Sequence, residues 1–291
     1  MVKAYAKINL GLRIIRKRED GYHDIETVFH RINLFDEISF EVASTISLSC
    51  NEPQIPLDER NLCIRAAQIL QNACGTVQGA HISLNKRIPI GAGLGGGSSD
   101  AASTLRGLLR LWNRNVDERI LKKLAIQLGS DVPYFLNDGS AYASGRGEIL
   151  GYVQLDIPYW IVLVYPNLHI STAWAYTNAQ VRRSGIPAGV PPGGTLKAMI
   201  ENISDLHQLS TLLHNDFEPV VFKEYPIVKE VKEKLIKRGA GFAQMSGSGS
   251  AVYGFFADES AALRAVDEFG KNYQASLTSP HFIPESVKLS R

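Results

Sequence analysis

The chain has 291 residues, of which 45% are hydrophobic and 21% are charged, and its formal net charge is +2. This is the composition of a globular protein with one large or two ordinary domains, and so small a charge gives no reason to expect a nucleic-acid partner. The longest apolar run is too short to span a membrane, and the three cysteines have no metal-ligand spacing, so we expect a cytoplasmic protein with reduced thiols.

The first predicted element is a strand at residues 5–10, where apolar and polar side chains alternate. Its polar face carries Lys7 and Asn9, which are either solvated or directed into a cleft. Two further strands are predicted at 25–29 and 37–48.

An Asp-Gly turn separates the first two of these strands and is followed by Tyr22 and His23. An aromatic residue and a histidine beside a turn are often surface or packing residues. They would also suit a ligand site in which the aromatic ring stacks on a planar ligand and the histidine forms hydrogen bonds with the edge of that ligand.

The most informative segment is residues 89–103, PIGAGLGGGSSDAAS, which follows a predicted helix from residue 62 and a strand at 81–85. Five of these fifteen residues are glycine, which indicates positive φ angles or close approach of the backbone to a ligand. An apolar helical face follows directly, and Ser98, Ser99 and Asp100 are the predicted N-cap candidates. A glycine-rich loop at a helix N-terminus is typical of a phosphate-binding site.

Two other interpretations of this loop are weaker. A flexible linker disagrees with the apolar helix directly behind it. A dinucleotide-binding loop needs a strand directly before the glycines and an acidic residue about 20 positions on. Here Pro89 interrupts the approach, and the acidic candidate Asp117 begins another predicted helix. No Walker A motif occurs in the chain.

The middle of the chain is predicted to hold a helix at 117–128, followed by Asp131, and strands at 140–144 and 148–150 around a turn. An Asp at the start of a helical turn is most often an N-cap, and the alternative is a general base.

The pattern changes near residue 155, so we expect an α+β protein with two lobes, residues 1–155 and 156–291. The predicted elements of the second lobe are a strand at 160–165, a loop at 184–194, helices at 205–214, 218–238 and 259–273, and strands at 241–245 and 251–256 around the Ser-Gly-Ser-Gly-Ser loop 246–250.

Six short motifs, taken together and in order, resemble those of the GHMP small-molecule kinases. They are AKINL at 6–10, DGYH at 20–23, KRIP at 86–89, GLGGGSS at 93–99, GSDVP at 129–133 and NDFE at 215–218. The resemblance implies an N-terminal lobe like ribosomal protein S5 domain 2 and a ferredoxin-like C-terminal lobe. It is strongest to the members that phosphorylate a CDP-linked methylerythritol in the non-mevalonate isoprenoid pathway.

The resemblance also implies roles for individual residues. Lys7 and Asp131 would be the catalytic pair, with Asp131 as the general base. The implied ATP-binding residues are Asn61, Lys86, Pro89, Ile90, Gly91, Ala92, Gly93, Leu94, Gly95, Gly96, Gly97, Ser98 and Ser99. The implied substrate-binding residues are Asn9, Tyr22, His23, Thr172, Tyr176, Ser246 and Gly247. Mg²⁺ is expected with ATP, but no residue is assigned to it, and both a monomer and a homodimer remain open.

Three alternatives to this function remain. The first is another GHMP kinase with a sugar or homoserine substrate. The second is a binding module on the same scaffold without catalytic activity, and the third, more distant, is a dinucleotide-dependent oxidoreductase.

Overall fold

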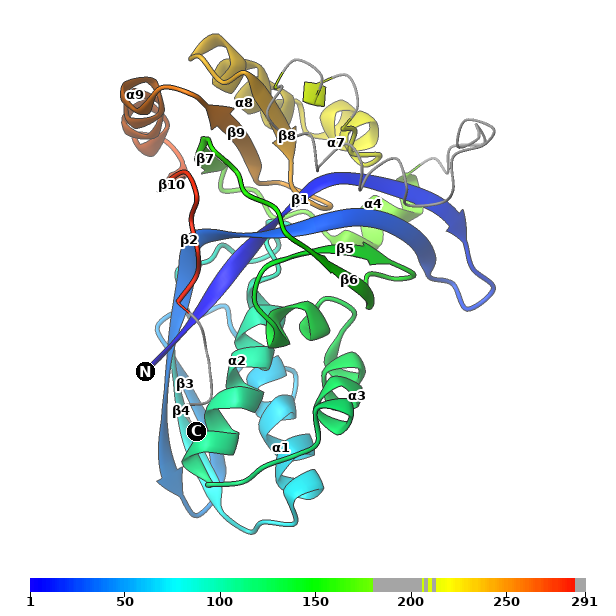
Figure 1. The fold of residues 1–291 in the computed structure, drawn as a ribbon, viewed down its shortest axis with the longest axis vertical. Coiled ribbons are helices and arrows are strands. Elements are labelled where there is room, and N and C mark those ends of the chain that lie inside the picture. The colour runs from blue at the N-terminus through cyan, green and yellow to red at the C-terminus, as the bar shows by residue number, and fades with distance from the viewer. Residues whose placement is uncertain (180–205, 207–208, 211–212, 286–291) are drawn as a thin grey trace.

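The computed structural model describes residues 1–179, 206, 209–210 and 213–285. A long hairpin crosses the middle of the molecule, with one group of helices on one side of it and a second sheet with its own helices on the other (Figure 1). The hairpin consists of strands β1, Val2–Lys17, and β2, His23–Ala43. It was expected as shorter strands, and β2 is one continuous strand where two were predicted.

The length of β2 follows from its partners. Along one edge it pairs with β1, and along the other edge it pairs first with β5, Ser140–Ser144, and then with β4, Gly79–Asn85. Backbone hydrogen bonds therefore hold β2 extended through a stretch that has no strong strand pattern. Strands β3, Ile46–Cys50, and β6, Ile149–Val153, complete a sheet with the order β3-β4-β2-β5-β6, and β1 pairs with β2 outside this path.

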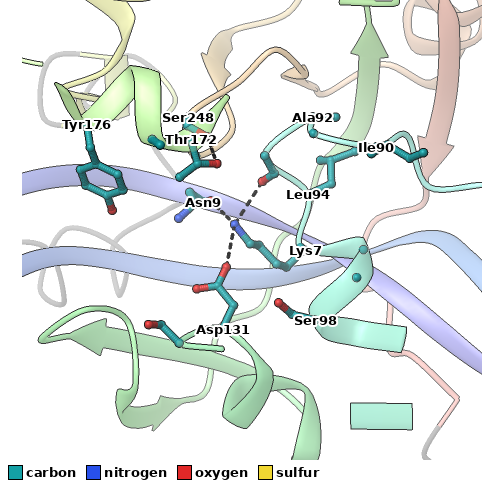
Figure 2. A pocket seen from close by; sticks show the side chains of 18 of the residues that line it. Lys7, Asn9, Ile90, Ala92, Leu94, Ser98, Asp131, Thr172, Tyr176 and Ser248 are labelled. Carbon is teal, nitrogen blue, oxygen red and sulfur yellow. Dashed lines mark hydrogen bonds and ion pairs between the residues drawn. The ribbon is translucent and has the colours of Figure 1, made fainter. Parts of the chain in front are cut away.

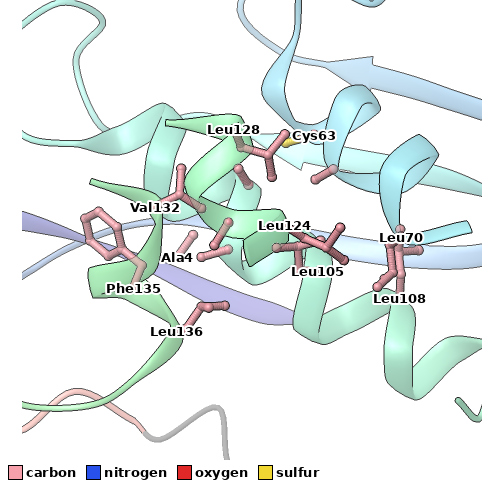
Figure 3. Packing of buried hydrophobic residues seen from close by; sticks show 14 of the residues in the cluster. Ala4, Cys63, Leu70, Leu105, Leu108, Leu124, Leu128, Val132, Phe135 and Leu136 are labelled. Atoms are coloured by element: carbon pink, nitrogen blue, oxygen red, sulfur yellow. The ribbon is translucent and has the colours of Figure 1, made fainter. Parts of the chain in front are cut away.

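Helices cover one face of this first sheet. They are α1, Leu62–Cys74, α2, Gly96–Leu111, and α3, Glu118–Leu128, followed by a short 3₁₀ helix, Val132–Leu136. Leucines of α2 and α3 pack against each other and against α1 in a continuous core, which also contains Val132 and Phe135 of the 3₁₀ helix (Figure 3). The core therefore fixes the residue directly before the 3₁₀ helix, Asp131.

The second lobe has the connectivity that was expected for a ferredoxin-like fold. Its elements are β7, Trp160–Tyr165, α4, Thr172–Asn178, α7, Glu218–Glu224, α8, Pro226–Lys237, β8, Phe242–Met245, β9, Val252–Phe256, α9, Glu259–Gly270, and β10, Gln274–Thr278. The sheet order is β10-β7-β9-β8.

Several details of this lobe differ from the prediction. Strand β10 and helix α4 were not predicted, and α9 ends three residues early. The helical stretch 218–238, in which Pro226 was expected to break or start a turn, forms two helices, and the second begins at Pro226, which has no N–H to continue the first. The predicted loop 184–194 and half of the predicted helix 205–214 lie outside the described residues. None of the helices in the described ranges is long and apolar enough to cross a bilayer.

The two sheets share a core. Ile8 and Leu10 of β1 belong to the same buried cluster as Ile161 of β7 and Tyr253 and Phe255 of β9. Polar contacts add to it: the Asn9 N–H donates to Ser246 Oγ at 3.2 Å, and the Tyr253 hydroxyl donates to the Asn9 carbonyl at 2.9 Å. The division near residue 155 stays a prediction. The first sheet ends at Val153 and the second begins at Trp160.

Candidate active site

A cavity of about 970 Å³ lies where β1, the glycine-rich loop, the 3₁₀ helix and α4 meet. It brings together most of the residues that the resemblance singled out from distant parts of the chain. Those that line it are Lys7, Asn9, Tyr22, His23, Asn61, Lys86, Pro89, Ile90, Gly91, Ala92, Gly93, Leu94, Gly95, Gly96, Gly97, Ser98, Asp131, Thr172, Tyr176 and Gly247. Ser99 and Ser246 do not line the cavity.

The centre of the site is the ammonium group of Lys7, which points from β1 into the cavity (Figure 2). Lys7 Nζ donates to Asn9 Oδ1 at 2.5 Å and to the Gly93 carbonyl at 3.1 Å, and it lies 3.7 Å from Asp131 Oδ2. Lys7 is almost fully buried, and this burial lowers its pKa, while the nearby Asp131 carboxylate opposes that change. Its position is fixed from three sides before any ligand is present.

Asp131 lies just before the 3₁₀ helix and has a side chain that is 32% exposed to the cavity. It occupies the N-cap position of this helix, as the N-cap interpretation has it, but its side chain makes no capping hydrogen bond and is left for another role. The turn between β5 and β6 approaches closely, since a Cβ built on Gly147 would lie 3.3 Å from Asp131 Oδ1. The carboxylate therefore faces a narrow space with Lys7 on one side.

Three glycines of the glycine-rich loop have positive φ angles. They are Gly91, Gly93 and Gly95, with φ angles of 62°, 77° and 69°. Such angles favour glycine. Space is also restricted: a Cβ on Gly93 would lie 2.1 Å from the Ser246 carbonyl oxygen, and one on Gly95 would lie 3.1 Å from Lys7 Cε. The loop can approach Lys7 and the 246–249 segment only because these side chains are absent.

Helix α2 begins earlier than predicted. Its N-cap is Gly95, and Ser98, Ser99 and Asp100 lie in its first turns, so their prediction as N-caps is wrong. Ser99 Oγ instead donates to the Tyr5 carbonyl at 2.7 Å, which ties α2 to β1. No side chain caps the helix. The first N–H groups of a 16-residue helix, together with its dipole, make the loop suitable for an anion such as phosphate.

Lys86 lies beneath the loop in a buried ion cluster. Its ammonium group donates to Asp36 Oδ2 and, at 2.7 Å, to Asp100 Oδ2, and all three side chains are at most 6% exposed. Burial lowers the pKa of Lys86, but the two carboxylates outweigh it and raise that pKa overall. Burial also raises the pKa of Asp100. Asp36 Oδ1 accepts the N–H groups of Arg87 and Ile88, so the cluster fixes the segment that enters the loop.

Two further residues expected at the ATP or substrate sites are engaged in structural contacts. Asn61 is the N-cap of α1, where its Oδ1 accepts from the Cys63 N–H at 2.8 Å and its Nδ2 donates to the Pro56 carbonyl. Ser246 Oγ donates to the Gly93 carbonyl at 3.0 Å. Both therefore support the walls of the cavity.

At the far end of the cavity, aromatic rings gather. The His23 ring stacks on Tyr176 with centroids 4.9 Å apart and an interplanar angle of 16°, and Tyr176 packs edge-on against Phe217. Tyr22 is 55% exposed, so its ring is accessible. Burial lowers the pKa of His23, and Lys17 adds to this, which favours the neutral imidazole that can both donate and accept a hydrogen bond.

The sequence analysis missed residues that line the cavity. Ser248 contacts Thr172, with their hydroxyls 3.0 Å apart (Figure 2), and Arg146 and Lys17 contribute cations. The signal for Arg146 was present, because a charged residue between Gly145 and Gly147 is typical of a tight turn that presents a side chain. Within the described ranges, no three His, Cys, Asp or Glu side chains cluster as metal ligands.

The chain is similar to known proteins over most of its length. The model of the GHMP kinases N terminal domain matches residues 61–139, and that of the GHMP kinases C terminal domain matches residues 196–275. A Prosthecochloris aestuarii protein named 4-diphosphocytidyl-2-C-methyl-D-erythritol kinase is 48% identical over 284 residues, with 97% of each chain covered.

Solved structures are similar as well. A crystal structure of 4-(cytidine 5'-diphospho)-2C-methyl-D-erythritol kinase has a TM-score of 0.79 and 35% identity, with 95% of this chain and 97% of that chain covered. A homoserine kinase from Cytophaga hutchinsonii has a TM-score of 0.68 over 95% of this chain and 93% of that chain, at 16% identity, which shows a shared fold alone.

Proposed function

Because this chain belongs to the GHMP kinases, and within them to the 4-diphosphocytidyl-2-C-methyl-D-erythritol kinase family, we propose that it transfers the γ-phosphoryl group of ATP to the 2-hydroxyl of that acceptor. The single observation that supports the chemistry best is the buried Lys7 ammonium, held between Asp131 and the glycine-rich loop. This places a carboxylate and a cation at the end of a phosphate-binding loop.

In the proposed mechanism, Asp131 accepts the proton of the acceptor hydroxyl as the oxygen attacks the γ-phosphorus. Lys7 orients the carboxylate at 3.7 Å and stabilises negative charge that develops between the acceptor and the phosphoryl group. The loop N–H groups at the start of α2 hold the ATP phosphates. Phosphoryl transfer depends mainly on such positioning and electrostatic stabilisation, so a rigid arrangement suits it.

The other end of the cavity is proposed to bind the cytidine. Tyr22 and Tyr176 offer ring faces for stacking, and neutral His23 offers a donor and an acceptor for the base edge. In this protein His23 and Tyr176 stack on each other, so we expect the base to displace or extend this stack. Thr172 and Asn9 line the path between the rings and the catalytic pair.

Mg²⁺ is expected to accompany ATP and to neutralise phosphate charge, since Mg²⁺ commonly binds through substrate phosphates and few protein ligands. Among the described residues, no three His, Cys, Asp or Glu side chains form a cluster that could hold a metal ion. We assign it no protein ligand and no step. The expected cytoplasmic location and the choice between monomer and homodimer stay predictions.

The proposal is tested by ADP release from Mg-ATP with the CDP-linked methylerythritol, against CMP, homoserine, mevalonate and galactose. We expect turnover with the first acceptor alone. Asp131→Asn should lower kcat about 10²- to 10⁴-fold while ATP still binds. Asp267→Asn is a matched control on an exposed side chain of α9 and should change nothing.

The remaining alternatives predict different results. Turnover with homoserine or a sugar would keep the fold and the catalytic pair but contradict the cytidine site. Binding of both ligands without ADP release would favour a binding module without catalytic activity.

A further inference from the structure

The turn between β5 and β6 places a cation on the cavity wall. Arg146 is flanked by Gly145 and Gly147, which have φ angles of 68° and 110°. The Gly145 carbonyl accepts the Ile25 N–H of β2 at 2.7 Å, and the Arg146 N–H donates to Glu148 Oε2 at 2.7 Å. The turn is therefore anchored to the central strand, and it presents Arg146 from a fixed position.

Arg146 lies between the two ends of the proposed acceptor site. On one side its guanidinium carbon is 4.8 Å from the centre of the Tyr22 ring. On the other side its neighbour Gly147 lies beside Asp131, because a Cβ built on Gly147 would lie 3.3 Å from Asp131 Oδ1. A molecule that stacks a base near Tyr22 and offers a hydroxyl to Asp131 must cross the space that Arg146 faces.

The charge of Arg146 is only partly compensated, by the carboxylates of Glu148 and, through a weaker electrostatic interaction, of Asp20. Among the described residues its ion pair is with Glu148, at 3.8 Å, which is long for a hydrogen bond. The nearby hairpin arginines are different: Arg16 pairs with Asp24 at 2.6 Å, and Arg18 pairs with both Asp24 and Asp20. Among the described residues that line the cavity beside Tyr22 and His23, Arg146 and Lys17 carry the positive charge.

We infer that Arg146 binds the diphosphate that links the cytidine to the reacting polyol, and so helps to determine that the acceptor is a nucleoside diphosphate derivative. This inference rests on the proposed function. In such an acceptor the diphosphate separates the base from the hydroxyl, as Arg146 separates Tyr22 from Asp131. The planar guanidinium can donate two parallel hydrogen bonds to phosphate oxygens, which a lysine cannot.

The test compares binding of cytidine, CMP and CDP to the full chain by titration calorimetry. Wild-type protein should bind CDP more tightly than cytidine, and Arg146→Met should lose most of this difference, a weakening for CDP of about 10- to 100-fold, with cytidine affinity retained. Arg146→Lys should fall in between. Arg16→Met is the matched control, because Arg16 is exposed on the neighbouring β1–β2 hairpin and does not line the cavity.

Steady-state kinetics give a second readout. Arg146→Met should raise KM for the acceptor and leave KM for ATP unchanged. CDP affinity in Arg146→Met equal to that of the wild type would overturn the inference and leave the proposed function intact. An equal loss for cytidine and CDP would also overturn it, because Arg146 would then only support the Tyr22 ring. Failure of the wild-type protein to bind any of the three ligands would refute the proposed function itself.

Discussion

Replacing Gly93 by Ala tests whether close contact between the glycine-rich loop and the second lobe positions the catalytic lysine. The Gly93 carbonyl accepts hydrogen bonds from Lys7 Nζ and Ser246 Oγ. A Cβ on Gly93 would lie 2.1 Å from the Ser246 carbonyl oxygen, a backbone atom that cannot turn aside. The loop or the 246–249 segment would have to move, and the carbonyl that holds Lys7 would move with it.

The expected loss of unfolding free energy in Gly93→Ala has two parts. An alanine at the φ angle of Gly93, 77°, costs about 1–2 kcal/mol. Relief of the steric overlap costs about 1–3 kcal/mol more. The chain offers a matched control, Gly139, which has a φ angle of 95° and no atom within 4 Å of a built Cβ. Gly139→Ala should therefore show the first cost without the second.

Urea unfolding and steady-state kinetics measure both effects. We expect Gly93→Ala to lose about 1–3 kcal/mol more unfolding free energy than Gly139→Ala. We expect kcat to fall on the order of 10²-fold, as for an active-site group displaced by about 1 Å, with no such fall in Gly139→Ala. If the two variants have equal stability and both keep kcat, the contact between the loop and residue 246 does not position Lys7.

Two further predictions concern buried charge. Lys86→Met should lower the free energy of unfolding by about 3–5 kcal/mol, because Asp36 and Asp100 lose their shared cation. A large rise in KM for ATP at unchanged stability would show instead that Lys86 binds the nucleotide. Burial lowers the pKa of His30 from 6.5 to about 4, so its neutral form favours folding, and stability should fall by about 3 kcal/mol as pH decreases from 6.5 to 4. Urea unfolding across this pH range should show the fall, and His30→Gln should remove it; an unchanged pH profile in the variant would assign the dependence to other groups.

Local pattern was enough to predict much of the fold. The alternation in β1 predicted a polar face with Lys7 and Asn9, and both residues line the cavity. The strand at 160–165 and the helix after Asp117 were predicted within a residue of their observed bounds, because strong apolar periodicity and an N-cap lie in the sequence itself.

The failures have tertiary causes. Strand β10 has a weak pattern, QASLT, and is extended because it pairs with β7. Helix α2 begins at Gly96 rather than after Asp100, since Ser99 bonds to Tyr5 on another element. In the site, the roles of Lys86 and Asn61 as nucleotide ligands stay predictions, since both residues line the cavity. Their structural partners, Asp36 and Pro56, could not be identified from spacing.

The polar contacts between β1 and the second lobe have a consequence for how the protein is made. The Asn9 N–H bonds to a residue 237 positions later, and the Gly11 N–H bonds to Gln244, 233 positions later. Contacts of such sequence separation form late, because a long loop must close first. On a ribosome, the strand that carries Lys7 would emerge well before these partners, so we expect refolding to restore activity more slowly than it restores the helices of the first lobe.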